Sequence, residues 1–154
     1  MISEIRHFTD TIFYQVELTA RYTKMLGTQL FGKLGLGLTT EEFAALDIIS
    51  FNKSLCQRDL AKMILKDRAN TGKLLDSLET KGYITRELTS KNNRPVKIIA
   101  ITEAGKKIYN ETYEKLAPVH RIVEERIKNS NLSKVGDLLA DLREVLEDTI
   151  EIDI

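Results

Sequence analysis

The sequence predicts a mainly α-helical fold with a single β-hairpin near the middle of the chain. Apolar residues recur at helical spacing in six segments, and residues 83–88 and 96–101 alternate as strands. Turn-forming residues separate the two strand segments, which indicates that they pair with each other.

The first two helices are predicted over residues 8–33 and 40–52. Gly35 follows the first helix as a stop signal. Thr39 or Thr40 caps the second helix, whose acidic first turn complements the helix dipole, and Asn52 ends it.

Two shorter helices are predicted over residues 56–64 and 67–81. Asp67 caps the second of them, and Gly82 stands just past its end, where glycine is favoured. The stripe of this helix that should face the core is Thr71, Leu74, Leu75 and Leu78. A bracing helix, a tight turn and a second helix, followed by a hairpin, make a winged helix-turn-helix.

The hairpin turn and two further helices complete the chain. Asn92 and Asn93 lie in the turn and can adopt positive φ. Thr102 caps a helix over 102–128, which Pro118 should kink or interrupt. A last helix, over 132–149, carries apolar residues at heptad-like spacing.

Length and composition fit one domain, or one domain with helical extensions. The chain has 154 residues, 42% of them hydrophobic and 30% charged. It contains no run of 18 apolar residues and no apolar leader, so we expect neither a membrane span nor a signal peptide. The single cysteine, Cys56, excludes an intrachain disulfide, and we expect a cytoplasmic protein.

Charge is unevenly distributed although the formal net charge is zero. Residues 53–97 contain eleven Lys and Arg against five acids, a net +6, whereas residues 1–52 carry −2 and residues 98–154 carry −4. A basic middle attracts a polyanion locally, although a solvated helix face would give the same count. Together with the helix-turn-helix, the charge predicts double-stranded DNA as the partner.

The exposed face of helix 67–81 is the predicted reading surface. Asn70 can make a bidentate contact to adenine, and Lys73 can reach a guanine or a phosphate. Arg94 on the wing is suited to the minor groove, although such a turn could also be plain solvated loop. The predicted DNA-contacting residues are Gln57, Arg58, Arg68, Asn70, Thr71, Lys73, Ser77, Lys91, Asn93, Arg94 and Lys97.

Gly72 lies in the second turn of this helix, where glycine costs about 1 kcal/mol relative to alanine. A bare backbone there has two explanations. Either the DNA backbone approaches it closely, or a neighbouring helix packs against it.

Several short motifs stand in a fixed order between residues 38 and 110. They are LTTEEFAALDII at 38–49, DLA at 59–61, LETKG at 78–82 with Arg86, a basic wing, and ITEAG at 101–105. This order and spacing resembles the MarR family of bacterial winged-helix regulators. The family's wing carries an Asp-x-Arg-Arg-like run, of which only Arg94 is matched here.

The resemblance implies a homodimeric transcription regulator, usually a repressor, bound to an inverted-repeat operator. Residues 1–36 and 103–154 would form a helical dimerisation domain, and residues 37–102 the winged helix-turn-helix domain. Apolar side chains on the first and last helices agree with this, although both helices could instead pack on their own chain. The resemblance also implies a small anionic or aromatic effector and no cofactor. Candidate effector-binding residues are Phe13, Tyr14, Tyr22 and Phe43, which could equally be core residues.

Other functions are less favoured by the sequence. A winged helix can serve as a protein-interaction scaffold, but a scaffold does not require so many cations on one surface. No nucleophile–base pair or phosphate loop indicates an enzyme, and His7 and His120 are too isolated to indicate a metal site. Cys56 begins a helix, where a redox role or a simple capping role is possible. Members of the family that sense oxidants carry their cysteine in the first helix, which has none here.

Overall fold

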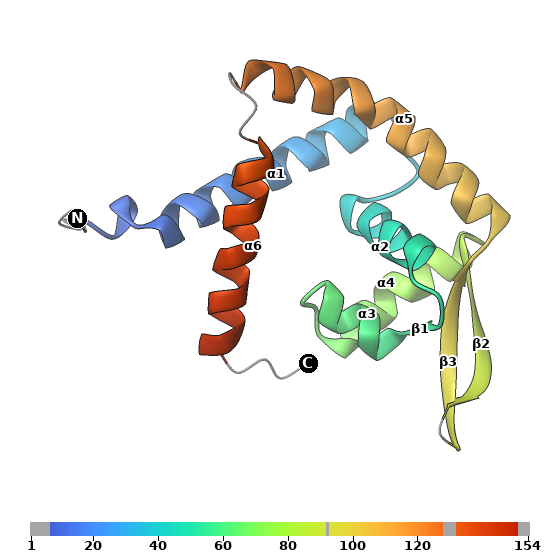
Figure 1. Ribbon diagram of the computed structural model, residues 1–154. Helices are drawn as coiled ribbons and strands as arrows, with labels where there is room; N and C mark the ends of the chain where they lie inside the picture. The colour runs from blue at the N-terminus through green and yellow to red at the C-terminus, as the bar shows by residue number, and fades with distance from the viewer. Residues whose placement is uncertain (1–6, 92, 128–131, 151–154) are drawn as a thin grey trace. The chain divides into compact units, whose positions relative to one another are not determined.

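The computed structural model describes residues 7–91, 93–127 and 132–150. Two compact units make up the chain, Met1–Phe43 and Ala44–Ile154. The elements, labelled in Figure 1, are a 3-10 turn η1 (Phe8–Asp10), α1 (Ile12–Lys33), α2 (Thr40–Phe51), β1 (Leu55–Cys56), α3 (Gln57–Met63), α4 (Arg68–Thr80), β2 (Ile84–Lys91), β3 (Arg94–Ile101), α5 (Glu103–Arg126) and α6 (Leu132–Thr149). The mainly α-helical fold and its six helices are confirmed. Asn92 and Lys128, predicted in the wing turn and the long helix, lie outside the described residues.

The first helix begins later than predicted. Phe8–Asp10 forms a 3-10 turn, and Thr11 is extended, so α1 starts at Ile12. The hydroxyl of Thr11 accepts a hydrogen bond from Tyr14 N at 3.3 Å, and this cap fixes the helix start. Gly35 has φ +59°, which explains the glycine after the helix.

Capping at the start of α2 comes from Thr39. Its Oγ1 accepts from Glu42 N at 3.2 Å, and the carboxylate of Glu42 accepts from Thr39 N at 2.8 Å. This reciprocal pair is a capping box, which satisfies two backbone donors at once. At the other end, Asn52 Nδ2 donates to Ile48 O at 2.7 Å, as expected of the residue that ends the helix.

The core of the unit Ala44–Ile154 is built from one face of each short helix and the base of the sheet. The buried apolar side chains of these elements are Ala45, Leu46, Ile49, Leu55, Leu60, Ala61, Leu74, Leu75, Leu78, Ile84 and Ile99. Burial of a leucine or isoleucine side chain contributes about 1.5–3 kcal/mol, so this set holds α3, α4 and the wing together.

The sheet has three antiparallel strands in the order β1-β3-β2. β1 was not predicted; it pairs Leu55 with Ile99 and Cys56 with Ile98. The hairpin is longer than predicted, since β2 runs on to Lys91 and β3 begins at Arg94. Asn93 has φ +58°, the left-handed conformation expected in a two-residue turn. In Figure 1 the hairpin of β2 and β3 extends beyond α3 and α4.

Helix α5 is anchored to the start of the wing. Thr102 Oγ1 accepts from Gly105 N at 3.0 Å and donates to Gly82 O at 2.7 Å, so the predicted cap is confirmed. Further along, Tyr109 Oη donates to Asp47 on α2 at 2.5 Å, and this bond to a carboxylate raises the pKa of Tyr109 to about 12. Pro118 does not interrupt the helix, which bends along its length (Figure 1).

None of the described helices is both long and apolar enough to cross a membrane.

Candidate nucleic-acid interface

Helix α4 presents one face to the core and the other to solvent. Thr71, Leu74, Leu75 and Leu78 are buried, as the stripe predicted. Ala69, Asn70 and Lys73 lie on the exposed face. The helix is therefore supported along one side and open along the other, as a reading helix in a major groove must be.

The first turn of α4 is organised by Asp67. One carboxylate oxygen accepts from Asn70 N at 2.8 Å, and the other accepts from Asn70 Nδ2 at 2.6 Å. These hydrogen bonds, first from the backbone and then from the side chain of Asn70, lower the pKa of Asp67. The side chain of Asn70 is thus held at the helix start, at the end of α4 that would enter the groove.

Exposed cations surround this helix. Arg58 on α3 and Arg68 and Lys73 on α4 are exposed, and on the wing Arg94 and Lys97 are exposed too. Lys91 lies opposite Arg94 at the end of the hairpin, and Asn93 is in the turn between them. The unit therefore carries predicted cations on α3, on α4 and on the wing.

A hollow of about 630 Å³ separates the start of α3 from β3. Its lining residues are Ser54, Cys56, Arg58, Asp59, Arg94, Pro95, Val96 and Ile98. Two of the predicted contact residues, Arg58 and Arg94, thus border the same hollow although they are distant in sequence.

Thr71 has to be removed from the predicted contact residues. Its side chain is fully buried, and its hydroxyl donates to Asp67 O at 2.8 Å. A threonine can occupy an apolar stripe in this way because the helix backbone satisfies its hydroxyl. Ser77 is half-buried on the margin of the same helix.

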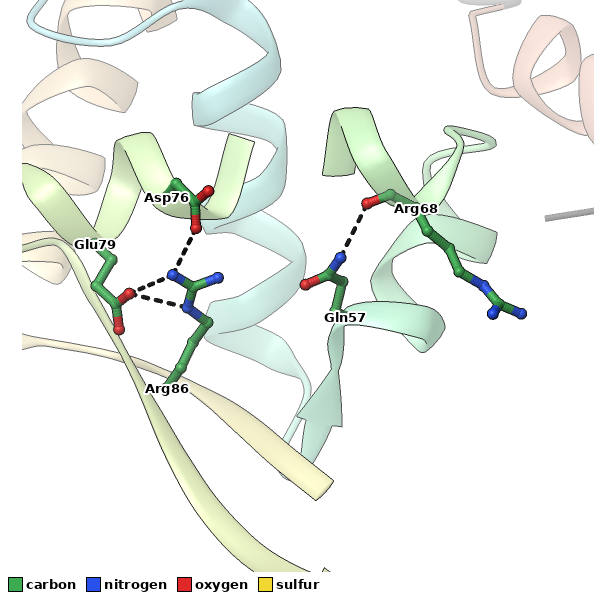
Figure 2. A network of polar contacts seen from close by, with 5 residues as sticks. All are labelled: Gln57, Arg68, Asp76, Glu79 and Arg86. Atoms are coloured by element: carbon green, nitrogen blue, oxygen red, sulfur yellow. Dashed lines mark hydrogen bonds and ion pairs between the residues drawn. The ribbon is translucent and has the colours of Figure 1, made fainter. Parts of the chain in front are cut away.

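Gln57 contacts the protein itself. Its Nε2 donates to the backbone carbonyl of Arg68 at 2.9 Å, as Figure 2 shows. A Cβ at Gly72 would stand 3.2 Å from the same nitrogen. The close neighbour of Gly72 in this structure is therefore a side chain of α3, which supports helix packing as the reason for the glycine.

Arg86 joins the wing to α4, a role that was not predicted from the sequence. Its Nε donates to Glu79 Oε2 at 3.0 Å, and its Nη2 donates to Asp76 at 2.7 Å and also to Glu79 (Figure 2). The hydrogen bonds from Arg86 lower the pKa of Glu79. The spacing of Asp76 and Glu79, one helical turn apart, was the available signal, but their partner is in another element.

Cys56 immediately precedes α3. Its thiol donates to the carboxylate of Asp59 at 3.0 Å, and its backbone N–H donates to the same oxygen at 3.4 Å. These bonds support the capping interpretation. Among the described residues, no group of three or more His, Cys, Asp or Glu side chains could hold a metal ion.

The four predicted effector residues all lie in the unit Met1–Phe43. Phe13 and Tyr22 are exposed on α1, Tyr14 meets the ring of Phe8 edge-on, and Phe43 meets the ring of Phe31. None of the four lines the hollow of about 300 Å³ between the end of α1 and the start of α2.

Comparison with known proteins shows which family this part of the chain is similar to. A model described as the MarR family matches residues 36–94. Two curated relatives from Bacillus subtilis (strain 168) are named uncharacterized HTH-type transcriptional regulators. YybA is 35% identical over 74 residues, which cover 48% of this chain and 49% of YybA. YfiV is 28% identical over 103 residues, which cover 64% of each chain. The chain thus spans about half to two thirds of the length of these relatives.

A solved structure supports the same fold. The structure titled transcriptional repressor CouR bound to a 23-mer DNA duplex superposes with a TM-score of 0.79. Identity is 18%, and the superposition covers 93% of this chain and 99% of CouR. At this identity the likeness concerns the fold alone.

Proposed function

We propose that this chain, whose residues 36–94 match a model of the MarR family, is a transcription regulator that binds double-stranded DNA. The observation that carries the proposal is the exposed face of α4, together with exposed cations on α3, on α4 itself and on the wing. Asn70 and Lys73 would enter the major groove, Arg58 and Arg68 would contact phosphates, and Arg94 would contact the adjacent minor groove.

The proposal includes a homodimer acting on an inverted repeat, in the cytoplasm. Exposed apolar side chains on α1 and α6 support it, including Phe13 at 55% and Leu138 at 67% exposure. Such side chains in number mark an interaction surface. Two symmetry-related reading helices would then meet half-sites about 34 Å apart, one turn of DNA.

Control by a small anionic or aromatic effector, acting on a repressor, is the further part of the proposal. The apolar and aromatic side chains exposed on α1 support it, since they could contact such a compound. Release of a bound duplex by such a compound would be the corresponding observation.

Binding to DNA is the experiment that tests the function. The purified protein is titrated against the intergenic duplex upstream of its own gene, and against a scrambled duplex, over a series of salt concentrations. We expect tight binding of two chains per site to the first duplex, with affinity that falls as salt rises. Weak binding without preference, on this duplex and on genomic fragments, would instead favour a winged-helix scaffold.

A further inference from the structure

Gly72 and Gln57 form a contact between the two helices of the helix-turn-helix. The amide nitrogen of Gln57 lies 2.9 Å from the carbonyl oxygen of Arg68. Arg68 and Gly72 are four residues apart, which is about one turn of an α-helix, so the amide rests on the first turn of α4. In Figure 2 the guanidinium of Arg68 points away from Gln57, and Arg68 takes part in the contact only through its backbone carbonyl.

A side chain at position 72 would disturb this contact. A Cβ at this position would lie 3.2 Å from Gln57 Nε2 and 3.9 Å from Gln57 Cδ, and no other heavy atom outside the neighbouring backbone of α4 would lie within 4 Å. The amide would have to move by a few tenths of an ångström. Any such movement alters its hydrogen bond to the Arg68 carbonyl. Position 72 is therefore bare on the side where Gln57 stands.

We propose that Gln57 is a positioning residue, which fixes the first turn of α4 on α3 and for which Gly72 leaves room. This inference rests on the proposed function, because the first turn of α4 carries Arg68 and Asn70. A helix that is anchored at this point presents both side chains to DNA in one orientation. A displacement of this turn would weaken base contacts, because hydrogen-bond geometry is narrow.

The proposal differs from a close approach of DNA to Gly72 in one measurable way. If the glycine makes room for Gln57, then Gly72→Ala should be harmful only while the long side chain is present. If it makes room for the DNA backbone, the same substitution should be equally harmful whatever residue stands at position 57.

A double-mutant cycle tests this difference. Wild type, Gly72→Ala, Gln57→Ala and the double variant are titrated against a bound duplex, and each is melted without DNA. Gly32→Ala is the matched control, since no heavy atom lies within 4 Å of a Cβ at that helical glycine. Contacting residues couple strongly enough to change an equilibrium constant roughly two-fold to hundred-fold.

We expect Gly72→Ala to weaken binding by a factor in that range in the wild-type background, and to have no effect in the Gln57→Ala background. Gly72→Ala should raise the melting temperature more in the Gln57→Ala background than in the wild-type background. Without Gln57, α4 gains the higher helix propensity of alanine and the new Cβ meets no amide. Equal losses of affinity in both backgrounds, or no loss in either, would overturn the proposal.

The melting curves separate this inference from the function itself. A wild-type protein that binds no duplex would overturn the DNA-binding function and the positioning role with it. The pairing of Gln57 with Gly72 would still be decided, because parallel shifts of melting temperature in the two backgrounds would exclude it.

Discussion

Single side chains on the wing contribute through charge. Arg94 is exposed near the end of the hairpin and borders the hollow at the start of α3. A contact with phosphate or with the minor groove releases counterions, so Arg94→Ala should weaken binding most at low salt. The slope of log affinity against log salt should become shallower by about 0.9 for one lost contact. Titrations of one duplex at several salt concentrations measure it.

Arg121, exposed on α5, supplies the matched control for that measurement. Arg121→Ala removes the same charge outside the proposed interface and should leave the salt slope unchanged. A loss of affinity in Arg94→Ala that is the same at all salt concentrations would show that Arg94 does not contact DNA.

Asn70 is the side chain that we expect to read a base. Its amide already donates to Asp67. In the complex it would either keep this hydrogen bond or replace it with hydrogen bonds to an adenine edge. Asn70→Ala should therefore relax preference at one position by about 1–3 kcal/mol. Competition among duplexes that differ at single base pairs measures this, and an unchanged preference at every position would refute the assignment.

At this scale the sequence predicted which side chains are cationic and exposed, but not which polar ones are engaged. Lys73 and Arg94 are exposed as predicted, because a long charged side chain remains in water unless it is paired. Thr71 and Gln57 bond instead to backbone carbonyls, of Asp67 and Arg68 respectively. Such bonds depend on three-dimensional neighbours, which residue type does not reveal.

Between elements, Gly105 in the first turn of α5 packs closely against the segment that precedes the wing. A Cβ there would lie 2.1 Å from Tyr83 O and 2.8 Å from a side-chain carbon of Ile101. Since a backbone carbonyl cannot yield easily, Gly105→Ala should destabilise the protein by about 1–3 kcal/mol or more. Thermal or urea unfolding measures the loss. Gly32→Ala should be neutral or slightly stabilising, and equal behaviour of the two variants would contradict the packing.

The second element-scale prediction concerns the Arg86 contacts between α4 and the wing. The Arg86 side chain is 18% exposed and its acidic partners more so, so solvent screening limits its contribution. Arg86→Gln should cost about 1 kcal/mol at pH 7. Arg86→Lys is the matched variant that keeps the charge and loses the planar guanidinium.

At acid pH the difference in unfolding free energy between wild type and Arg86→Gln should disappear. Bonding to Arg86 lowers the pKa of Glu79 below its ordinary 4.5, so its stabilising effect is complete above that pH and is lost as the pH falls through the depressed value. Unfolding free energies of wild type and Arg86→Gln, measured from pH 7 down to pH 3, should converge at the acid end. A constant difference over this range would assign the effect to packing.

Elements with a strong local pattern could be predicted, and those defined by a partner could not. Asp67, Thr102 and Gly82 marked helix ends correctly because capping is a local interaction. The strand β1 has two residues and exists only because Leu55 and Cys56 pair with β3. The hairpin was predicted too short, since its outer half is polar and is held by the register of the strands.

For the whole molecule, the distribution of apolar surface is the informative feature. The unit Ala44–Ile154 buries the apolar faces of α3 and α4, whereas Val135, Leu138 and Val145 on α6 remain 47%, 67% and 62% exposed. On α1, Ile12 and Phe13 are more than half exposed. The proposed association with a second copy would cover apolar side chains of this kind.

That association is open to direct measurement. Leu138→Glu places a charge among the apolar side chains of α6 and should convert a dimer into monomers, because an unpaired charge is costly at an apolar interface. Light scattering after size exclusion gives the mass, and Asp137→Asn is the control on the same exposed turn. Circular dichroism verifies that the variant is folded, and Val145→Glu serves as a second variant if it is not.

Dimerisation and DNA reading should be coupled through symmetry. A folded monomer presents one α4, so it should bind a duplex with one half-site as well as wild type does. It should not gain the additional affinity that a second half-site gives to a dimer. We therefore expect Leu138→Glu to lower affinity for the full inverted repeat far more than for the half-site. A variant that remains dimeric, or a monomer that binds both duplexes like wild type, would contradict this organisation.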